Sequence, residues 1–419
     1  MRPTTAIFAT LCYADFYSKT LIEDLRRDLD LRIIVVVDAF PDRIPAALNG
    51  HIDEIHVIKS VLEHDAFAAI DASALDEVIA KERTAHPDRE IRLICCEEII
   101  LSEVGALRLK WNLAGPRDRE LHFFRDKIAM KQKLARAGIK TPDFMEIDVE
   151  QIVHGHISYV ELANRFGKEF ILKPVDSKGS VAVELIGSDA QFQEWVKAWG
   201  ETLNRVDVEQ YIQGALYHVD SIVVDGKVSL QFASLYSIPP AEFKDGKVLG
   251  SITLKDNEPT STLLKRFARD ALEVLGATTM STHMEIFLMD NEPVFLEVAA
   301  RPPGAAVPPV YQMASGINIL DLDLMLQLGL QLPRLEAQHG YGFWAYFPLR
   351  EGVIVGLNKP HVENEHHFEW RVKVGTTVRS ASNLSHTAGV VFAGGSDYES
   401  VKRDFHSVIA HDALILASR

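Results

Sequence analysis

The first 115 residues alternate short apolar runs with amphipathic segments. Apolar runs of this length are typical of buried strands, and the segments between them have the period of a helix. The pattern predicts strands at residues 5–10, 31–37, 54–58 and 91–96, and helices at residues 17–30 and 73–82. Such an alternation predicts a doubly wound parallel α/β sheet.

The turn after the first predicted strand carries no phosphate-binding signature. It reads Leu11-Cys-Tyr-Ala-Asp15 and contains no glycine, whereas a dinucleotide-binding turn needs several. We therefore expect this domain to form a scaffold or a substrate-side wall.

The rest of the chain mixes helices and strands and predicts an α+β arrangement. Helices are predicted at residues 125–137, 263–275 and 320–328, and strands at residues 170–174, 207–212 and 217–228, the last folded as a hairpin at Asp225-Gly226. The final eighty residues differ in character, with short strands and a closing helix at residues 398–411. The predicted domain limits are residues 1–118, 119–206, 207–335 and 336–419.

A hairpin of two alternating strands is predicted between Ser281 and Gly304. A three-residue loop at residues 290–292 would place Glu285 opposite Glu297, with Cβ atoms about 5 Å apart. Like charges so placed are destabilising, and a cation with oxygen ligands would compensate, Mg²⁺ being the common case and Mn²⁺ an alternative. Removing one charge should then leave the empty protein at least as stable. The simpler alternative is an edge hairpin with solvated carboxylates.

Aromatic and basic residues near this hairpin favour a functional cleft. Phe287 and Phe295 are expected to share the face of the two carboxylates, and Arg301 follows Glu297 by four residues. Lys173 ends an apolar strand, where burial requires an anionic partner.

Other polar clusters are more simply explained as surface groups. The basic residues of the helix at 125–137, including Lys131 and Lys133, would by themselves be a solvated face. His361, His366 and His367 have no recognised metal-ligand spacing, so we expect surface histidines.

Composition excludes several classes of protein. The 419 residues carry a formal net charge of −15 and no basic block, which argues against a nucleic-acid partner. The three cysteines cannot build a disulfide framework, and no run of 18 apolar residues or signal-peptide pattern occurs. We therefore expect a cytoplasmic protein without membrane association, and the sequence leaves a homodimer open.

The order of these motifs resembles the ATP-grasp superfamily of carboxylate–amine ligases over roughly residues 120–330. By this resemblance ATP and Mg²⁺ are the expected cofactors. The resemblance implies that Lys127 and Lys173 bind the phosphates and that residues 176–180, with Ser180, form a phosphate loop. It further implies that the adenine contacts are Glu209, Tyr211 and Ile212, that the Mg²⁺ ligands are Glu285 and Glu297, and that Arg301 faces the phosphate.

The segment Ser281–Ile286 and the spacing from Glu297 to Arg301 look most like the L-amino-acid ligases, the bacilysin-type dipeptide synthetases. The resemblance implies catalytic roles for Arg301 and Lys173, and substrate contacts from His283, Arg301 and Gly304. It implies that an amino-acid carboxylate reacts with ATP to give an acyl phosphate, which an amine then attacks, with release of ADP and phosphate.

Three departures from the superfamily pattern bear on the metal and ribose contacts. Ala299 stands where many members have an asparagine ligand, which leaves the number of metal ions open. Ala182 replaces a frequent glycine, and Leu216 replaces a ribose-binding glutamate, so the ribose contact is unknown, with His218 as one candidate.

Two rival functions stay open on the sequence alone. Tyr217–Asp220 also resembles a stretch of biotin carboxylases, although the chain has no biotin-attachment motif. The departures at Ala299 and Leu216 would suit a non-catalytic nucleotide-binding protein. Neither the substrates nor a general base can be identified from the sequence.

Overall fold

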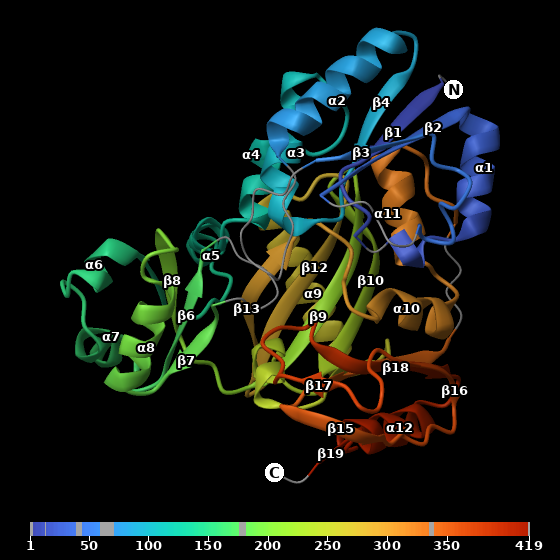
Figure 1. The fold of residues 1–419 in the computed structure, drawn as a ribbon. Helices are drawn as coiled ribbons and strands as arrows, with labels where there is room; N and C mark the ends of the chain where they lie inside the picture. Colours follow the sequence, from blue (N-terminus) through green and yellow to red (C-terminus); the bar gives the residue numbers. More distant parts are fainter. Residues whose placement is uncertain are drawn as a thin grey trace.

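The computed structural model describes residues 3–12, 14–38, 44–58, 71–175, 182–334 and 339–417. The chain forms an N-terminal α/β domain, a small α/β lobe that projects to one side, and a large antiparallel sheet between them (Figure 1). None of the described helices is long and apolar enough to cross a membrane.

The N-terminal domain is the predicted parallel sheet. Its strand order is β3-β2-β1-β4, and every pairing is parallel. The strands are β1 (Thr4–Phe8), β2 (Leu31–Val37), β3 (Glu54–Val57) and β4 (Glu90–Ile94), and the helices are α1 (Lys19–Leu29), α2 (Ala72–Ala85) and α3 (Leu101–Lys110). Helices α2 and α3 share one apolar core with the sheet, and α1 contributes to the core on its other face.

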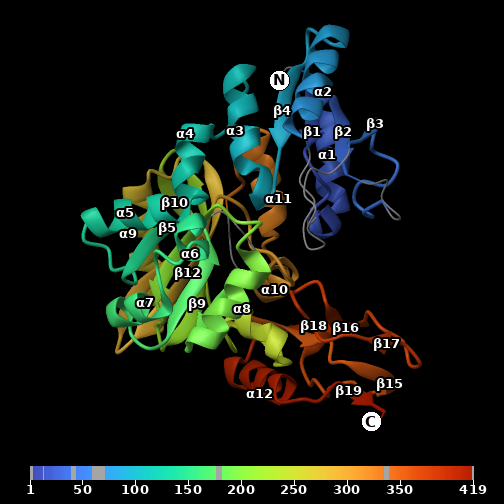
Figure 2. The ribbon, with the colours of Figure 1, turned by 60° about the vertical axis from the view of Figure 1, so that its left-hand side comes forward.

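A helix from much later in the chain completes this domain. Helix α11 (Ile319–Gln327) packs against β4, and the side-chain oxygen of Gln327 accepts a 2.8 Å hydrogen bond from the backbone N–H of Cys95. Leu320 and Leu324 lie in the same core as Val35. Both views show α11 beside the N-terminal strands (Figures 1 and 2). The N-terminal sheet therefore depends on residues outside the predicted limit of 118.

The small lobe is an antiparallel sheet of order β5-β8-β6-β7 covered by helices. Its strands are β5 (Phe144–Asp148), β6 (Phe170–Pro174), β7 (Glu184–Ile186) and β8 (Arg205–Gln210). Its helices are α6 (Val149–Val153), α7 (Tyr159–Phe166) and α8 (Asp189–Trp199), with α4 (Asp118–Leu121) and α5 (Lys127–Arg136) leading in. The predicted boundary between residues 206 and 207 falls inside β8.

The large sheet has eight strands in the order β13-β12-β9-β10-β11-β14-β18-β16. They are β9 (Ala215–Val224), β10 (Lys227–Tyr236), β11 (Leu249–Thr253), β12 (Met280–Met289), β13 (Glu292–Ala299), β14 (Tyr341–Pro348), β16 (Glu365–Trp370) and β18 (Thr387–Gly395). Helices α9 (Pro259–Leu275), α10 (Val307–Ser315) and α12 (Tyr398–Ile409) pack against it.

The C-terminal residues do not form the separate unit that their character suggested. Strands β14, β16 and β18 continue the sheet of residues 215–299, because β11 pairs directly with β14. Only a small sheet stands apart, made of β15 (Gly352–Leu357), β17 (Thr377–Val378) and β19 (Leu414–Leu416).

Candidate active site

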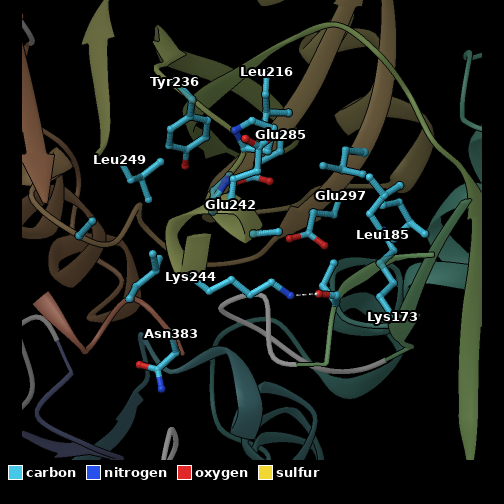
Figure 3. Close-up of a pocket in the computed structure, with 18 of the residues that line it drawn as sticks. Lys173, Leu185, Leu216, Tyr236, Glu242, Lys244, Leu249, Glu285, Glu297 and Asn383 are labelled. Carbon is cyan, nitrogen blue, oxygen red and sulfur yellow. Dashed lines mark hydrogen bonds between the residues drawn. The ribbon is translucent and has the colours of Figure 1, made fainter. Parts of the chain in front are cut away.

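A cavity of about 800 Å³ lies where the small lobe, the large sheet and the N-terminal domain meet. Its volume is in the usual range for a small-molecule site. Every predicted domain contributes to its lining, through residues such as Glu98, Lys173, Glu285 and Asn383. Figure 3 shows Glu285 and Glu297 extending into the same space, with Lys173 beside them and Asn383 on the opposite side.

The hairpin of β12 and β13 places Glu285 opposite Glu297, as predicted, although the loop length and the register of the strands differ from the prediction. The loop has two residues rather than three: Asp290 and Asn291 both have positive φ, at 51° and 61°, which is typical of a type I′ turn. That turn alone would put Glu285 one residue out of register with Glu297. A bulge at Leu296 restores the pairing, because an extra residue shifts the ladder by one.

The same bulge reverses the prediction for Phe295, whereas the prediction for Phe287 is confirmed. Phe287 lines the cavity, whereas Phe295 is fully buried in the core. Leu296 occupies the cavity face in its place. The cavity wall beside the carboxylates is therefore half aliphatic.

Each carboxylate of the pair already has a basic side chain beside it. Glu285 Oε1 lies 3.7 Å from His283 Nε2, and Glu297 Oε2 lies 3.5 Å from Lys127 Nζ. Burial raises the pKa of Glu285, but His283, together with His218 and Tyr236, more than offsets this effect, and the net pKa is lowered. The expectation that two uncompensated charges destabilise the empty protein is therefore wrong.

The pair nevertheless has the composition of a magnesium site. Mg²⁺ is usually held by one or two carboxylates together with substrate phosphates. Glu285 and Glu297 face each other across one ladder and both line the cavity, so they fit this ion. Ala299, which is Cα-paired with His283, supplies no further oxygen ligand there.

A buried polar network lies under this pair. Asp220 is fully buried, and its carboxylate is 2.6 Å from His283 Nδ1 and 2.8 Å from His218 Nδ1. It also accepts a hydrogen bond from the hydroxyl of Tyr311. Burial lowers the pKa of His283, but the carboxylate of Asp220 has the larger opposite effect, and the net pKa is raised to about 9. His283, which lines the cavity, is therefore protonated at neutral pH.

His218 is positioned differently from its predicted role at the ribose. Its side chain is fully buried, its Nε2 lies 3.0 Å from Ser251 Oγ, and it is absent from the cavity lining. A direct contact with a nucleotide is therefore not offered by this geometry. Leu216 does line the cavity.

Two lysines and two carboxylates form a second buried cluster. Lys173 Nζ lies 2.8 Å from Glu209 and 3.8 Å from Asp207, and Lys131 forms ion pairs with both carboxylates. Burial lowers the pKa of Lys173, but the two carboxylates raise it above its ordinary value. The pKa of Asp207 is raised by burial and by the charge of Glu209. The anionic partner expected for Lys173 is thus present.

Lys131 and Lys127 correct the interpretation of their helix as a solvated basic face. Lys131 is fully buried, and Lys127 is only 5% exposed and lines the cavity. Lys131 and Asp207 were not predicted as part of the site. Their signal in the sequence is weak, since charges on a helix face and on a strand are usually solvated.

The predicted adenine linker lies on the cavity wall. Glu209, Tyr211 and Ile212 line the cavity, together with the apolar side chains of Ile171 and Leu185. The pairing of β8 ends at Gln210, so the backbone groups of Tyr211 and Ile212 lie beyond the ladder. This arrangement suits recognition of a flat base by backbone groups.

The predicted phosphate loop, residues 176–180 with Ser180, lies outside the described residues. Ala182, just after it, has φ of 56°, in the left-handed region that favours glycine. This is the position where the superfamily frequently has a glycine, so the local backbone geometry agrees with that pattern.

Arg301 forms an ion pair with Glu98 at the junction with the N-terminal domain. Its Nε and Nη2 both lie 2.9 Å from Glu98 Oε2. Burial raises the pKa of Glu98, but the charges of Arg301, Lys127 and Arg125 lower it to about 2. Glu98 was missed from the sequence, although it follows β4 at the carboxyl edge of a parallel sheet, where ligand-binding groups gather.

Further parts of the cavity wall come from Gly304 and from the chain after α10. Gly304, predicted as a substrate contact, lines the cavity just before α10. Trp344, Tyr346, Arg371 and Asn383 also line it and were not predicted. The pairing of β11 with β14 brings Trp344 and Tyr346 to the site, and no local pattern in the sequence marks any of the four residues.

The histidines near residue 365 take no part in a metal cluster within the described ranges. Among those residues, the group of three or more potential metal ligands is His218, Asp220 and His283, and the nitrogen atoms facing Asp220 are within hydrogen-bonding distance of it. His361 and His367 are exposed, in agreement with the prediction of surface histidines.

These features define the class of domain. The model of the ATP-grasp domain matches residues 124–305, which include the small lobe and the carboxylate hairpin. The chain therefore carries an ATP-grasp domain behind an N-terminal parallel sheet, and the predicted fold is confirmed.

Particular relatives narrow the resemblance. The chain is 24% identical over 260 residues to an L-arginine-specific L-amino acid ligase of Bacillus subtilis, which covers 60% of this chain and 61% of that protein. In fold it resembles an L-amino acid ligase from Bacillus licheniformis, with a TM-score of 0.72, 18% identity and full coverage of both chains. It also resembles a biotin carboxylase–β-γ-ATP complex from Campylobacter jejuni, with a TM-score of 0.65, 17% identity, and coverage of 99% and 92%.

Proposed function

We propose that this protein is an ATP-dependent carboxylate–amine ligase that forms an amide bond from an amino acid and releases ADP and phosphate. The observation that supports this most strongly is the constellation in one cavity of Glu285, Glu297, Lys127, Lys173 and Arg301. Phosphoryl transfer needs positioned cations and little covalent chemistry from the protein, and this set supplies them.

The first step is the transfer of the γ-phosphoryl group to a carboxylate. A carboxylate oxygen attacks the γ-phosphorus, the bond to the bridging oxygen breaks, and ADP leaves. Lys127 and Lys173 bind phosphate oxygens, and Arg301 faces the transferred group. Mg²⁺ held by Glu285 and Glu297 would neutralise phosphate charge. Because the lysines are buried beside carboxylates, their positions are set before ATP arrives.

The second step forms the amide. The nitrogen of a neutral amine attacks the acyl carbon, the bond to the phosphate oxygen breaks, and phosphate leaves with its electron pair. The amine nitrogen then loses a proton to solvent. The cavity walls would keep water from the acyl phosphate, whose hydrolysis competes with this step.

Trapping with hydroxylamine tests this function directly. The protein is incubated with ATP, Mg²⁺, hydroxylamine and each of the twenty standard amino acids, and hydroxamate and ADP are measured. We expect hydroxamate and ADP in equal amounts with at least one amino acid. Formation of AMP and pyrophosphate would exclude the acyl-phosphate route. ADP release that depends on bicarbonate alone would instead favour a carboxylase, and nucleotide binding without turnover would indicate a non-catalytic protein.

A further inference from the structure

The two edges of the large sheet differ in how they are protected from pairing with another chain. The edge strand β13 contains Pro293 and the bulge at Leu296, and the N–H of Phe295 donates a 2.9 Å hydrogen bond to the carbonyl of Lys140. Proline, bulges and covering loops are usual protection for an edge. The opposite edge strand, β16, contains no proline or lysine, and its ladder with β18 has no register shift. Figure 1 shows β16 at the outer margin of the sheet.

Three residues of β16 direct their backbone groups away from the sheet. The N–H of Arg371 donates a 2.9 Å hydrogen bond to the carbonyl of Ala388, and in an antiparallel ladder every second residue before it also bonds β18. The N–H and C=O groups of His366, Phe368 and Trp370 therefore point outward. No backbone group among the described residues bonds them. They form a template for a further antiparallel strand.

The charges on the exposed face of β16 are complementary to those of a second copy of the same strand. Glu365, His367 and Glu369 are exposed on one face, and Arg371 continues the alternation. When two copies of β16 pair antiparallel about a two-fold axis at Phe368, Glu365 lies opposite Arg371 of the second copy. In the same pairing His367 lies opposite Glu369 of the second copy. The symmetry repeats each contact, and opposite charges at directly paired positions stabilise a sheet.

Neighbouring registers bring like charges together. A two-fold axis at His367 would place Glu365 opposite Glu369 of the second copy, and an axis at Glu369 would place that carboxylate opposite its own copy. An axis between two residues would pair outward backbone groups with inward ones and side chains of opposite faces. Because like charges directly opposite each other are destabilising, the register about Phe368 is favoured.

The other face of β16 supplies aromatic contacts at the same axis. The rings of Phe368 and Trp370 are half-buried, and their centroids lie 4.7 Å apart in an edge-to-face arrangement. In the register about Phe368, this side chain meets its own copy, and Trp370 lies opposite His366 of the second copy. Aromatic cross-strand pairs stabilise a sheet, and aromatic residues are enriched in protein interfaces.

We propose that two copies of this protein associate through antiparallel pairing of β16, which joins their large sheets into one continuous sheet. The sequence alone leaves a homodimer open, and this inference assigns it one surface and one register. The interface is independent of the proposed ligase reaction. It adjoins the cavity, because Arg371 directly follows β16 and lines the cavity.

Cysteine substitutions at two exposed positions test the register. In the pairing about Phe368, residue 367 of one copy faces residue 369 of the other as a non-hydrogen-bonded pair, with Cα atoms about 4.5 Å apart, which a disulfide can bridge. Each of these residues lies about 8 Å from its own copy, which is too far for a disulfide. The proteins compared are His367→Cys, Glu369→Cys and the variant with both changes, all under mild oxidation by copper–phenanthroline. Wild type is the control for the three native cysteines.

We expect sedimentation equilibrium to show wild type as a dimer, and non-reducing electrophoresis to show a covalent dimer with the double variant only. Hydrogen exchange should show protection of the three outward amides at concentrations at which the dimer forms, and loss of that protection on dilution. The proposal is overturned if wild type stays a single chain at every concentration, if the dimer lacks this protection, or if the double variant forms no disulfide. Cross-linking of His367→Cys or Glu369→Cys alone would place the axis at another residue and refute this register.

Discussion

Replacing Glu297 by glutamine tests the centre of the site through activity and stability together. The change keeps the shape of the side chain and removes one charge from the carboxylate pair. If Glu297 holds a metal ion that acts on the transition state, turnover should fall on the order of a hundredfold or more. Stability should also change, because Glu297 Oε2 lies 3.5 Å from the ammonium of Lys127.

The size of the stability effect follows from two opposing interactions. Attraction between unit charges 3.5 Å apart is about 1 kcal/mol in water and about 5 kcal/mol at an effective dielectric constant of 20. The Glu297 side chain is 36% exposed, which favours the lower value. Loss of repulsion from Glu285, which has His283 beside it, returns part of this. We therefore expect a net loss below about 1 kcal/mol in the free energy of unfolding.

Urea denaturation without ligands and a coupled assay for ADP release measure the two effects. Glu292→Gln is the matched control, since Glu292 is on the same strand, is exposed and pairs with the exposed Lys140. It should lose no activity and less than about 0.5 kcal/mol of stability. Normal turnover of Glu297→Gln at ordinary magnesium concentration would refute the metal assignment. Unchanged or increased stability would refute the importance of the pair with Lys127.

Other changes test the remaining charged groups. Lys173→Ala should weaken ATP binding at least tenfold, about 1.4 kcal/mol, by calorimetric titration; unchanged affinity in a folded variant would remove Lys173 from the site. The same variant should be less stable, because Asp207 and Glu209 lose a buried partner. The pKa of Glu98 is lowered to about 2 by Arg301, Lys127 and Arg125, so these interactions should stabilise the fold above about pH 4.5. The contribution, about 3 kcal/mol, should be lost as the pH falls toward 2. Glu98→Gln should therefore flatten acid denaturation in that range, and an unaltered profile would contradict the ion pair.

The sequence by itself determined the features that are local in the chain. Apolar runs identified the N-terminal strands, because a strand buried on both faces has no polar side. The order of Lys127, Lys173, Glu285, Glu297 and Arg301 was enough to predict the ATP-grasp domain. Alternation and a turn signal were also enough to pair the two carboxylates.

The details of that pairing needed the tertiary structure. Neither the two-residue turn nor the bulge at Leu296 was predicted, and the two errors cancelled for Glu285 and Glu297 but not for Phe295. A bulge depends on how the sheet twists against its neighbours, and no residue type at that position signals it.

Long-range packing determined which charged side chains are buried and which residues line the far end of the cavity. Lys131 was predicted to lie on a solvated helix face, but β8 places Asp207 and Glu209 beside it as ion-pair partners. Arg371 reaches the site only because β16, β18 and β14 continue the sheet that carries the carboxylates. Strand order across a sheet is set by contacts between residues far apart in the chain, so the local pattern that predicts a strand does not predict its neighbours.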